Sequence, residues 1–291
     1  MRTAPDSELM SQFAVFILTH GRPDNVITYQ TLRKIGYTGR IFLIVDNLDK
    51  NQEKYKEKYG DEVVIFDKPA VAKTFDQGDN FADLRSVIYA RNACFDLAEK
   101  LGVKYFIQLD DDYTSFQFRF DNKLDYRYQP MEGFDRILMS LVRFYIVSGC
   151  HSVAIAQGGD FMGGEESTNA QNVRLMRKCM NSFVCSTERP FKFMGRLNDD
   201  VNTYVHMASI GLLMFTTNQI SLQQAQTQTN PGGLTELYLD FGTYVKSFYS
   251  VMYQPSSVRV KMLMSNNPRI HHAITWRNTA PMILREDLRK P

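Results

Sequence analysis

Short apolar runs recur through the first third of the chain and alternate with polar segments that have helical spacing. Three such runs cover residues 13–18 (FAVFIL), 41–45 and 63–66. Uninterrupted apolar runs of this length are typical of parallel strands buried on both faces. Asp24 or Asn25 is placed to cap an intervening helix that reaches residue 35. The alternation predicts an α/β fold with a parallel sheet and crossover helices.

A longer helix and strand follow, and they end in three adjacent carboxylates. The apolar face of this helix, which continues to Lys100, consists of Leu84, Val87, Ile88, Cys94, Phe95 and Ala98. Arg91 lies within the apolar face, so its guanidinium must reach solvent or pair with an anion. The strand YFIQL (residues 105–109) then leads directly into Asp110, Asp111 and Asp112.

The second half of the chain is less regular, and no repeat or linker separates it from the first. Helices are expected over residues 134–146, 173–180, 201–208 and 234–253. Strands are expected over residues 152–156, 183–185, 211–215 and 258–264, with a further alternating strand at RIHHAIT (269–275). We therefore expect one compact domain over residues 1–291.

Composition is that of an ordinary globular protein. The 291 residues are 44% hydrophobic and 23% charged, and the net charge of +2 neither requires nor excludes a nucleic-acid partner. Four cysteines without a CxxC pair are expected to be reduced thiols. The first residues show no signal-peptide pattern and no apolar run reaches ~18 residues, so we expect a cytoplasmic protein without a membrane partner.

The carboxylates of Asp110, Asp111 and Asp112 are the strongest candidates for chemistry. Like charges ~4 Å apart repel by roughly 4 kcal/mol at an effective dielectric constant near 20, so the triplet needs water, a basic partner or a cation. In a continuing strand, Asp110 and Asp112 share one face and Asp111 points away. Such a D-x-D pair at the carboxyl end of a strand suits a hard divalent cation and phosphate oxygens. The alternative is an acidic turn solvated by water.

Two later motifs contain further candidates. NDDV (198–201) places Asp199 and Asp200 at the start of a helix, as a second acidic pair of the site or as a simple helix cap. His271 and His272 are neighbours in an alternating strand, so at most one is expected to reach a shared site. Neither a P-loop nor a GxGxxG sequence is present, which argues against P-loop nucleotidases and dinucleotide dehydrogenases.

Several of these stretches together resemble a known family. FAVFILTHGRPDN (13–25), FDK (66–68), DNF (79–81), ARNACFDLAEKLGVKYFIQLDDDY (90–113) and the later NDD resemble the TET-associated glycosyltransferases, which are encoded largely by bacteriophages. The resemblance is dense over residues 13–116. It implies an α/β, GT-A-like fold, in which a Rossmann-like nucleotide-binding half (13–119) with a mixed central sheet is attached to an acceptor half (120–291).

The resemblance also implies roles for single residues in a donor site. Thr19, Arg22 and Asp46 are expected to line the uridine of a UDP-sugar. Arg91 is expected to face the donor diphosphate or the acidic cluster. Asp110 is expected to contact the ribose, and Asp111 is included in the same cofactor-binding set.

Metal and catalytic roles are implied in the same way. Asp112 is expected to bridge Mn²⁺ or Mg²⁺ to the diphosphate. Asp199 or Asp200 matches a later acidic pair, which we interpret as catalytic, and His271 or His272 matches a C-terminal histidine that completes the metal site.

The implied reaction is transfer of a sugar from UDP-glucose or a related UDP-hexose to the hydroxymethyl group of a 5-hydroxymethylpyrimidine in DNA, either 5-hydroxymethylcytosine (hmC) or 5-hydroxymethyluracil (hmU). For a phage-encoded enzyme the compartment is the host cytoplasm. The alternatives are a GT-A enzyme acting on a polysaccharide, protein or small molecule, a nucleotidyltransferase, and a non-enzymatic nucleic-acid-binding module. No protein partner is inferred.

Basic residues gather between residues 173 and 196. The candidates for DNA contacts are Arg174, Arg177, Lys178, Lys192 and Arg196, with Phe161, Phe191 and Phe193 as rings that fill the gap left by, or stack on, an extruded base. The first three share a face if residues 173–180 are helical. Such a run is commonly a solvated surface, and the resemblance is what favours DNA here.

Overall fold

The structure is a computed structural model that describes residues 5–172, 175–225, 234–242, 244–264 and 268–279. Its main sheet contains the strands β1 (Phe13–Leu18), β2 (Arg40–Asp46), β3 (Val63–Phe66), β4 (Tyr105–Asp110), β5 (Tyr113–Phe120), β6 (Tyr126–Pro130), β7 (Ser152–Gln157), β8 (Ser182–Ser186) and β9 (Met214–Gln224). A separate two-stranded ribbon is formed by β10 (Val258–Leu263) and β11 (Arg269–Ile274).

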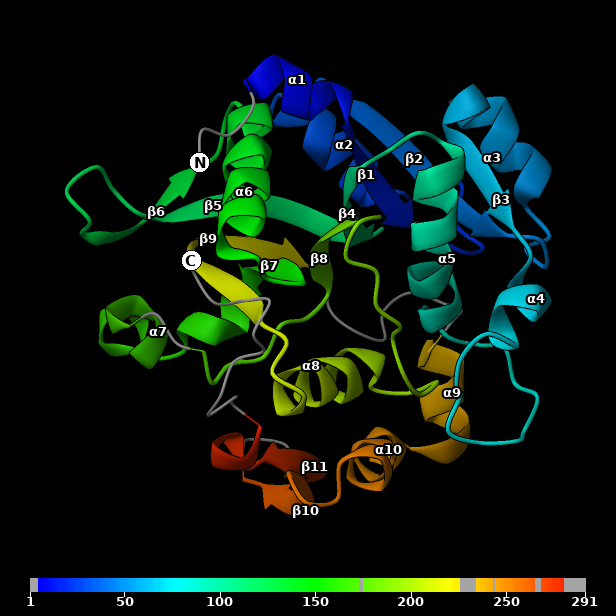
Figure 1. Ribbon diagram of the computed structural model, residues 1–291, viewed down its shortest axis with the longest axis vertical. Helices are drawn as coiled ribbons and strands as arrows, with labels where there is room; N and C mark the ends of the chain where they lie inside the picture. The colour runs from blue at the N-terminus through cyan, green and yellow to red at the C-terminus, as the bar shows by residue number, and fades with distance from the viewer. Residues whose placement is uncertain (1–4, 173–174, 226–233, 243, 265–267, 280–291) are drawn as a thin grey trace.

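Helices cover both faces of the main sheet (Figure 1). They are α1 (Asp6–Ser11), α2 (Ile27–Lys34), α3 (Gln52–Tyr59), α4 (Lys68–Ala72), α5 (Ile88–Lys100), α6 (Phe134–Ser148), α7 (Thr168–Gln171), α8 (Asp199–Ser209), α9 (Leu234–Phe241) and α10 (Val245–Tyr253). Four short 3₁₀ turns add η1 (Gly60–Glu62), η2 (Gly158–Phe161), η3 (Gly164–Glu166) and η4 (Trp276–Asn278).

The sheet has the strand order β3-β2-β1-β4-β8-β7-β9-β5-β6. The first four of these strands are parallel, as in a Rossmann-like unit. Strand β8 is antiparallel to both β4 and β7, β9 is parallel to β7, and β5 is antiparallel to β9 and β6. The sheet is therefore mixed and continuous through both halves of the chain, and the predicted α/β class with a mixed central sheet is confirmed.

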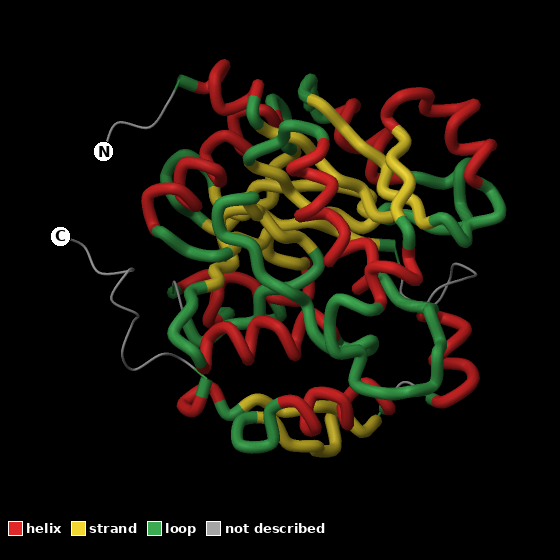
Figure 2. The backbone as a smooth tube through the Cα atoms, turned by 45° about the vertical axis from the view of Figure 1, so that its right-hand side comes forward, coloured by secondary structure: helices red, strands yellow, loops and turns green. Residues whose placement is uncertain are grey.

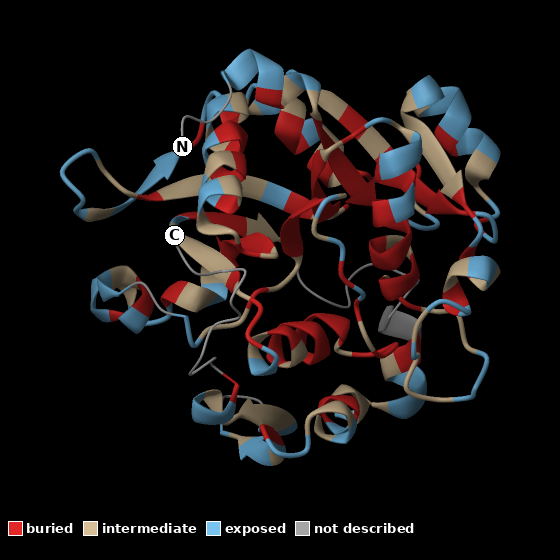
Figure 3. Cartoon of the chain, viewed as in Figure 1, coloured by how far each residue is buried: buried red, intermediate tan, exposed pale blue. Residues whose placement is uncertain are grey.

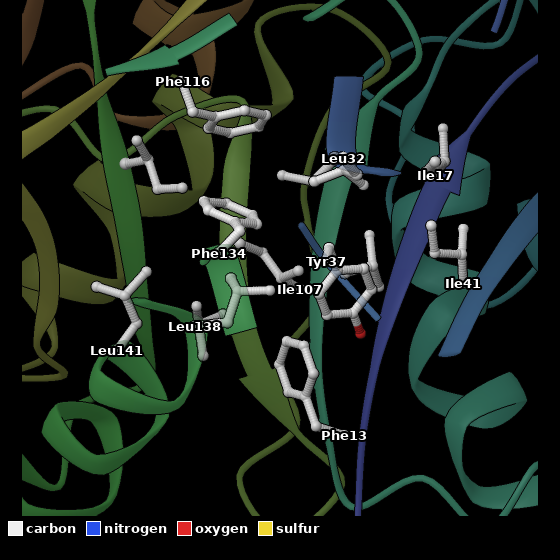
Figure 4. Close-up of a cluster of buried hydrophobic side chains, with 14 of the residues drawn as sticks. Phe13, Ile17, Leu32, Tyr37, Ile41, Ile107, Phe116, Phe134, Leu138 and Leu141 are labelled. Carbon is white, nitrogen blue, oxygen red and sulfur yellow. The ribbon is translucent and has the colours of Figure 1, made fainter. Parts of the chain in front are cut away.

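Two hydrophobic cores lie on the two faces of this sheet. Phe13, Val15 and Ile17 of β1 belong to the core that α6 covers (Figure 4). The alternate residues of β1 belong to the other core, together with residues of α5 and α8. This period of two explains why an uninterrupted apolar run is needed in a strand buried on both sides. The buried positions accordingly follow the sheet and the inner faces of its helices (Figure 3).

Buried amides fix the segment that leads into α8. The side chain of Asn92, in α5, donates to the carbonyl oxygen of Phe193 at 3.1 Å and accepts from the Phe193 amide at 2.8 Å. Asn202, in α8, donates to the carbonyl oxygens of Met194 and Leu197, each at 3.0 Å. Because buried backbone groups need such partners, these contacts hold the start of α8 against α5.

Several sequence predictions of secondary structure are wrong at their ends. Helix α2 begins at Ile27 without a side-chain cap, because residues 22–25 form a turn in which the Asn25 amide donates to the Arg22 carbonyl oxygen. The strand predicted at 211–215 begins at Met214 and continues to Gln224, because β9 pairs with β5 as well as with β7. The predicted helix 234–253 is divided at Gly242, whose φ of +82° ends α9.

The prediction of a basic helix at 173–180 is also wrong. Its described residues, 175–180, contain no helical turn. Arg177 and Lys178 instead both pair with Asp160, at 3.0 Å and 2.6 Å. Tertiary ion pairs here override a helical spacing that is by itself a weak preference.

The ribbon β10–β11 packs on α10 at the far side of α8 from the main sheet, as the views in Figures 1 and 2 agree. Its core-facing side contributes Val258 and Ile274 to the hydrophobic core under α5 and α8. Within the part of the chain that the structure describes, no helix is both long and apolar enough to cross a membrane.

Candidate active site

Arg91 lies between two carboxylates at the carboxyl end of β4. Its Nη2 is 3.4 Å from Asp110 Oδ1 and its Nε is 3.3 Å from Asp199 Oδ2, and its side chain is 3% exposed. The guanidinium also lies over the rings of Phe183 and Phe193, with its Cζ 5.0 Å and 5.5 Å from their centroids. Arg91 of α5 therefore pairs with acidic side chains. The sequence leaves two partners open for it, the donor diphosphate and the acidic cluster.

The environment of Arg91 shifts both of its carboxylate partners toward the neutral form. Burial, together with the neighbouring aspartates, raises the pKa of Asp110 to about 7, although Arg91 opposes the shift. Burial raises the pKa of Asp199 to about 6, again against Arg91, with Asp200 adding to the rise. Two carboxyl groups with pKa values near neutrality, held by one cation, can exchange protons at physiological pH.

Asp111 turns away from that pair and holds the loop after β1. Its Oδ2 accepts a hydrogen bond from Thr19 Oγ1 at 2.7 Å, and its Oδ1 is 3.0 Å from Arg22 Nη2. Thr19 Oγ1 also contacts the Tyr55 hydroxyl at 2.9 Å. The strand β4 ends at Asp110, so the continuing strand assumed for the three aspartates is wrong: Asp111 lies in the following turn and is buried. It contacts Thr19 and Arg22, two of the three residues expected at the uridine.

Asp112 keeps one carboxylate oxygen free of protein partners. Its Oδ2 accepts from Gln224 Nε2 at 3.2 Å, whereas its Oδ1 is buried and has no hydrogen-bond partner among the described residues. Burial raises the pKa of Asp112. In the described ranges, no group of three or more His, Cys, Asp or Glu side chains could hold a metal ion. The site therefore fits a cation that takes one carboxylate and completes its shell with oxygens of a bound phosphate, rather than an all-protein cage.

The end of β2 contains an ion-pair network that sequence reasoning missed in part. Asp46 Oδ2 is 2.7 Å from His20 Nδ1 and 3.0 Å from Lys68 Nζ, and its Oδ1 accepts from the Leu48 amide. Burial alone acts to raise the pKa of Asp46, but His20 and Lys68 lower it to about 2. Asp46 is thus engaged by the protein, and the half-exposed His20 is its neighbour at the surface. Lys68 could have been found in the FDK stretch, whereas nothing in the sequence connected His20 to Asp46.

The second acidic pair and the histidines lie around the N-terminus of α8. Asp200 Oδ1 accepts from the Val201 amide at 2.8 Å, the contact of a helix start. His272 Nδ1 lies 3.1 Å from Asn198 Nδ2, so His272 is the histidine that faces α8. Burial, with His271 and Lys246, lowers the pKa of His272 to about 3, so its imidazole is neutral. The metal-ligand role predicted for His271 and His272 stays a prediction.

Of the basic residues predicted to contact DNA, Arg177 and Lys178 share the carboxylate of Asp160, and Arg174 lies outside the described residues. Arg196 is buried and pairs with Asp79 at 2.8 Å and Asp83 at 3.2 Å. That burial contradicts a role for Arg196 in contacting phosphates. Lys192 alone of the described four is exposed and has no recorded ion pair.

The three aromatic candidates are buried as well. Phe191 packs edge-on against Phe95, Phe193 does the same against Phe183, and both are in the core under α5. Phe161 is covered, with the Arg119 guanidinium over its ring. In this structure none of these three rings is placed to stack on an extruded base.

A family model described as TET-Associated Glycosyltransferase matches residues 13–233. The chain belongs to this family. The match spans every strand of the main sheet, the aspartates after β4 and the acidic pair of α8. This TET-associated glycosyltransferase is therefore an enzyme of sugar transfer, which excludes the nucleotidyltransferase and the non-enzymatic binding module. No curated protein matches the chain.

Solved glycosyltransferase structures show a distant similarity in shape. Glucosyl-3-phosphoglycerate synthase from Mycobacterium tuberculosis, in complex with Mg²⁺ and UDP, has 10% identity and a TM-score of 0.46 over 94% of this chain and 93% of that chain. The mannosyltransferase PcManGT from Pyrobaculum calidifontis, with GDP-Man and Mn²⁺, has 10% identity and a TM-score of 0.46 over 84% and 74%. S. aureus TarS 1–349, with UDP-GlcNAc, has 12% identity and a TM-score of 0.43 over 82% and 66%.

The raised pKa of Asp110 predicts how the free energy of unfolding changes with pH. Its folded-state pKa of about 7 lies above the unfolded value of ~3.9, so folding takes up a proton between these values and the free energy of unfolding falls as pH rises through the window. Asp110→Asn cannot ionise. Its free energy of unfolding relative to the parent protein, measured by chemical denaturation, should rise from pH 5 to 7 by up to about 1.4 kcal/mol per pH unit and level off above. Asp96→Asn, exposed on α5, is the control; a constant difference for Asp110→Asn would contradict the assignment.

Removal of Arg91 should be most damaging at high pH. Arg91→Gln leaves Asp110 and Asp199 buried without their cation, a change that costs about 3–5 kcal/mol when both are ionised. At pH 5 the carboxyl groups can be protonated, so the loss should be smaller. Chemical denaturation at pH 5 and pH 8 measures this difference. The double variant Arg91→Gln/Asp199→Asn should recover part of the loss at pH 8, and equal losses at both pH values would count against the ion-pair account.

Proposed function

We propose that this glycosyltransferase transfers a hexosyl group from a UDP-sugar to the hydroxymethyl group of a 5-hydroxymethylpyrimidine in DNA, with Mn²⁺ or Mg²⁺ as cofactor. The observation that carries the proposal is the buried Asp110–Arg91–Asp199 arrangement next to Asp112. It lies beyond the carboxyl end of a parallel strand, where open α/β sheets bind their ligands. Residues 13–119 then form the donor half and residues 120–291 the acceptor half.

The side chains at the ends of β1 and β2 support a UDP-sugar as the sugar donor. Asp46, with its pKa near 2, is ionised at neutral pH, so the Nδ1 of His20 must donate to it. In a neutral imidazole, this contact leaves Nε2 of His20 as the hydrogen-bond acceptor. Uracil carries a donor at N3, whereas cytosine carries an acceptor there. We assign base recognition to His20, with Asp46 orienting it, and we assign Thr19 and Arg22 to the rest of the nucleoside.

Asp112 is the residue that would hold the divalent cation, because its Oδ1 is buried without a protein partner among the described residues. When bound, the cation neutralises charge that develops on the departing diphosphate. Arg91 holds Asp110 and Asp199 in place. Its Nη1 is buried without a hydrogen-bond partner among the described residues, so it can donate a hydrogen bond to an oxygen of the UDP-sugar.

Asp199 is assigned as the general base. Its pKa of about 6 suits proton transfer near neutral pH, while Asp200 accepts a hydrogen bond from the adjacent Val201 amide. In a displacement with inversion, Asp199 takes the proton of the hydroxymethyl group, whose oxygen bonds to the anomeric carbon. The bond from that carbon to the diphosphate oxygen breaks, and its electron pair leaves with UDP.

The acceptor assignment is supported by the family to which the chain belongs, whose resemblance implies hydroxymethylated bases in DNA. A polysaccharide, protein or small-molecule acceptor is the second candidate. It differs from the first in a single observable, which is the molecule that carries the sugar after the reaction.

The experiment is a donor and acceptor screen with mass spectrometry of digested DNA. We expect a hexose mass on hmC or hmU from one UDP-sugar, with loss of transfer on chelation. Asp112→Asn and Asp199→Asn should each reduce transfer by at least about 100-fold, and Asp199→Asn should still bind UDP, because the base acts only in the transition state. Asp96→Asn is the matched control. No transfer to either modified base with any UDP-sugar would overturn the acceptor assignment, and full activity of Asp112→Asn in chelator would overturn the metal role.

A further inference from the structure

A second basic surface lies on the ribbon β10–β11, outside the residues that the family model matches. In the antiparallel register, Lys261 pairs with His271, and Leu263 pairs with Arg269. Residues that pair across strands share a face, as do residues two apart along one strand. One face of the ribbon therefore carries Arg259, Lys261, Arg269 and His271.

This face points away from the protein core. Val258 and Ile274, on the opposite face, are part of the core under α5 and α8. Arg259, Lys261 and Arg269 are all exposed. Figure 1 shows the ribbon at the outer edge of the molecule, beyond α8 and beside α10.

The charges of this basic face are not neutralised within the described chain. Neither strand of the ribbon contains an acidic residue. Among the described residues, Arg259, Lys261 and Arg269 take part in no recorded ion pair. Arg177 and Arg196, two of the basic residues predicted from sequence to contact DNA, differ in this respect because each is paired with a carboxylate. An uncompensated cluster of cations on a two-stranded ribbon is the electrostatic footprint of a polyanion site.

Positive charge continues from the ribbon toward the catalytic pair. Lys246, near the start of α10, is partly buried, and burial lowers its pKa while Asp200 raises it and Arg269 lowers it further. Lys246 therefore lies within electrostatic range of both the acidic pair and the ribbon. His272, on the core-facing side of the ribbon, contacts Asn198 directly before the acidic pair. The ribbon that carries the basic face therefore also contacts the segment directly before the acidic pair.

We propose that the basic face of β10–β11, defined by Arg259, Lys261, Arg269 and His271, binds the phosphate backbone of the acceptor DNA. This inference rests on the proposed function and names the surface that holds its acceptor. Neutralising phosphates releases condensed counterions, so each contact contributes affinity that falls with salt. A two-stranded ribbon is also narrow enough to enter the major groove.

The test is charge reversal in the full-length protein. Lys261→Glu/Arg269→Glu removes two proposed phosphate contacts, and Lys54→Glu/Lys100→Glu makes the same charge change at exposed positions of α3 and α5. Binding of a labelled ~20-base-pair hmC duplex is measured by fluorescence anisotropy at several salt concentrations, UDP binding by calorimetry, and folding by thermal denaturation. The ribbon variant should bind DNA about 10- to 100-fold more weakly at low salt, with a salt slope smaller by about 2. The neutral Lys261→Gln/Arg269→Gln variant should lose less affinity.

The two binding measurements distinguish the phosphates of DNA from the diphosphate of the sugar donor. We expect DNA binding to weaken in the ribbon variant while UDP binding and melting temperature stay unchanged. Loss of UDP affinity with normal DNA affinity would assign the face to the donor diphosphate and overturn the inference. Equal losses of DNA affinity in the ribbon and control variants would also overturn the inference, because they would show a general effect of net charge. Parental DNA affinity and salt slope in a variant that still modifies DNA would overturn the ribbon assignment and leave the proposed function standing.

Discussion

The rest of the site depends on one buried cation shared by two carboxylates. Arg91 has lost almost all contact with water, so it is stable only if anions meet it from both sides. Asp110 comes from the end of β4 and Asp199 from the start of α8, and these positions are far apart in sequence. Pairing this one guanidinium therefore brings the end of the Rossmann-like part of the sheet to a helix of the second half of the chain. The rings of Phe183 and Phe193 form the apolar side of the same pocket.

This arrangement concentrates negative charge where a phosphate-bearing donor is proposed to bind, which needs a physical explanation. Burial holds the aspartates partly in the neutral form, as the raised pKa values of Asp110 and Asp199 indicate. Asp111 is offset by Arg22, and Asp112 retains one unpartnered oxygen. A divalent cation that arrives with a diphosphate would neutralise both the phosphates and the acidic edge, that is, the carboxylates of Asp110, Asp111 and Asp112. Among the described residues, no group of three or more His, Cys, Asp or Glu side chains could hold a metal ion.

The sequence predicted those features that depend on local pattern. The buried strands follow from uninterrupted apolar runs, and the acidic edge follows from the aspartates after β4. The anion partner of Arg91 was predictable because a cation inside an apolar helix face has few other solutions. The family resemblance added roles for residues that spacing alone could not assign.

Features that depend on distant contacts could not be predicted in this way. The helix expected at 173–180 is absent from residues 175–180, where Asp160 captures Arg177 and Lys178 across a loop. Likewise, His20 gains a role only because Asp46, on another strand, is placed beside it. Charge clustering in the sequence also does not reveal which cations are already paired in the fold, as Arg196 is with Asp79 and Asp83.

The central claim is that the acidic edge is completed by the phosphates of the donor, and it is tested most directly by the coupling between Mn²⁺ and UDP. Calorimetric titration of Mn²⁺ into the protein, with and without saturating UDP, measures that coupling. The account predicts that UDP tightens Mn²⁺ binding by about tenfold or more, that Mn²⁺ tightens UDP binding by the same factor, and that Asp112→Asn removes both effects. Equal Mn²⁺ affinity with and without UDP would contradict it.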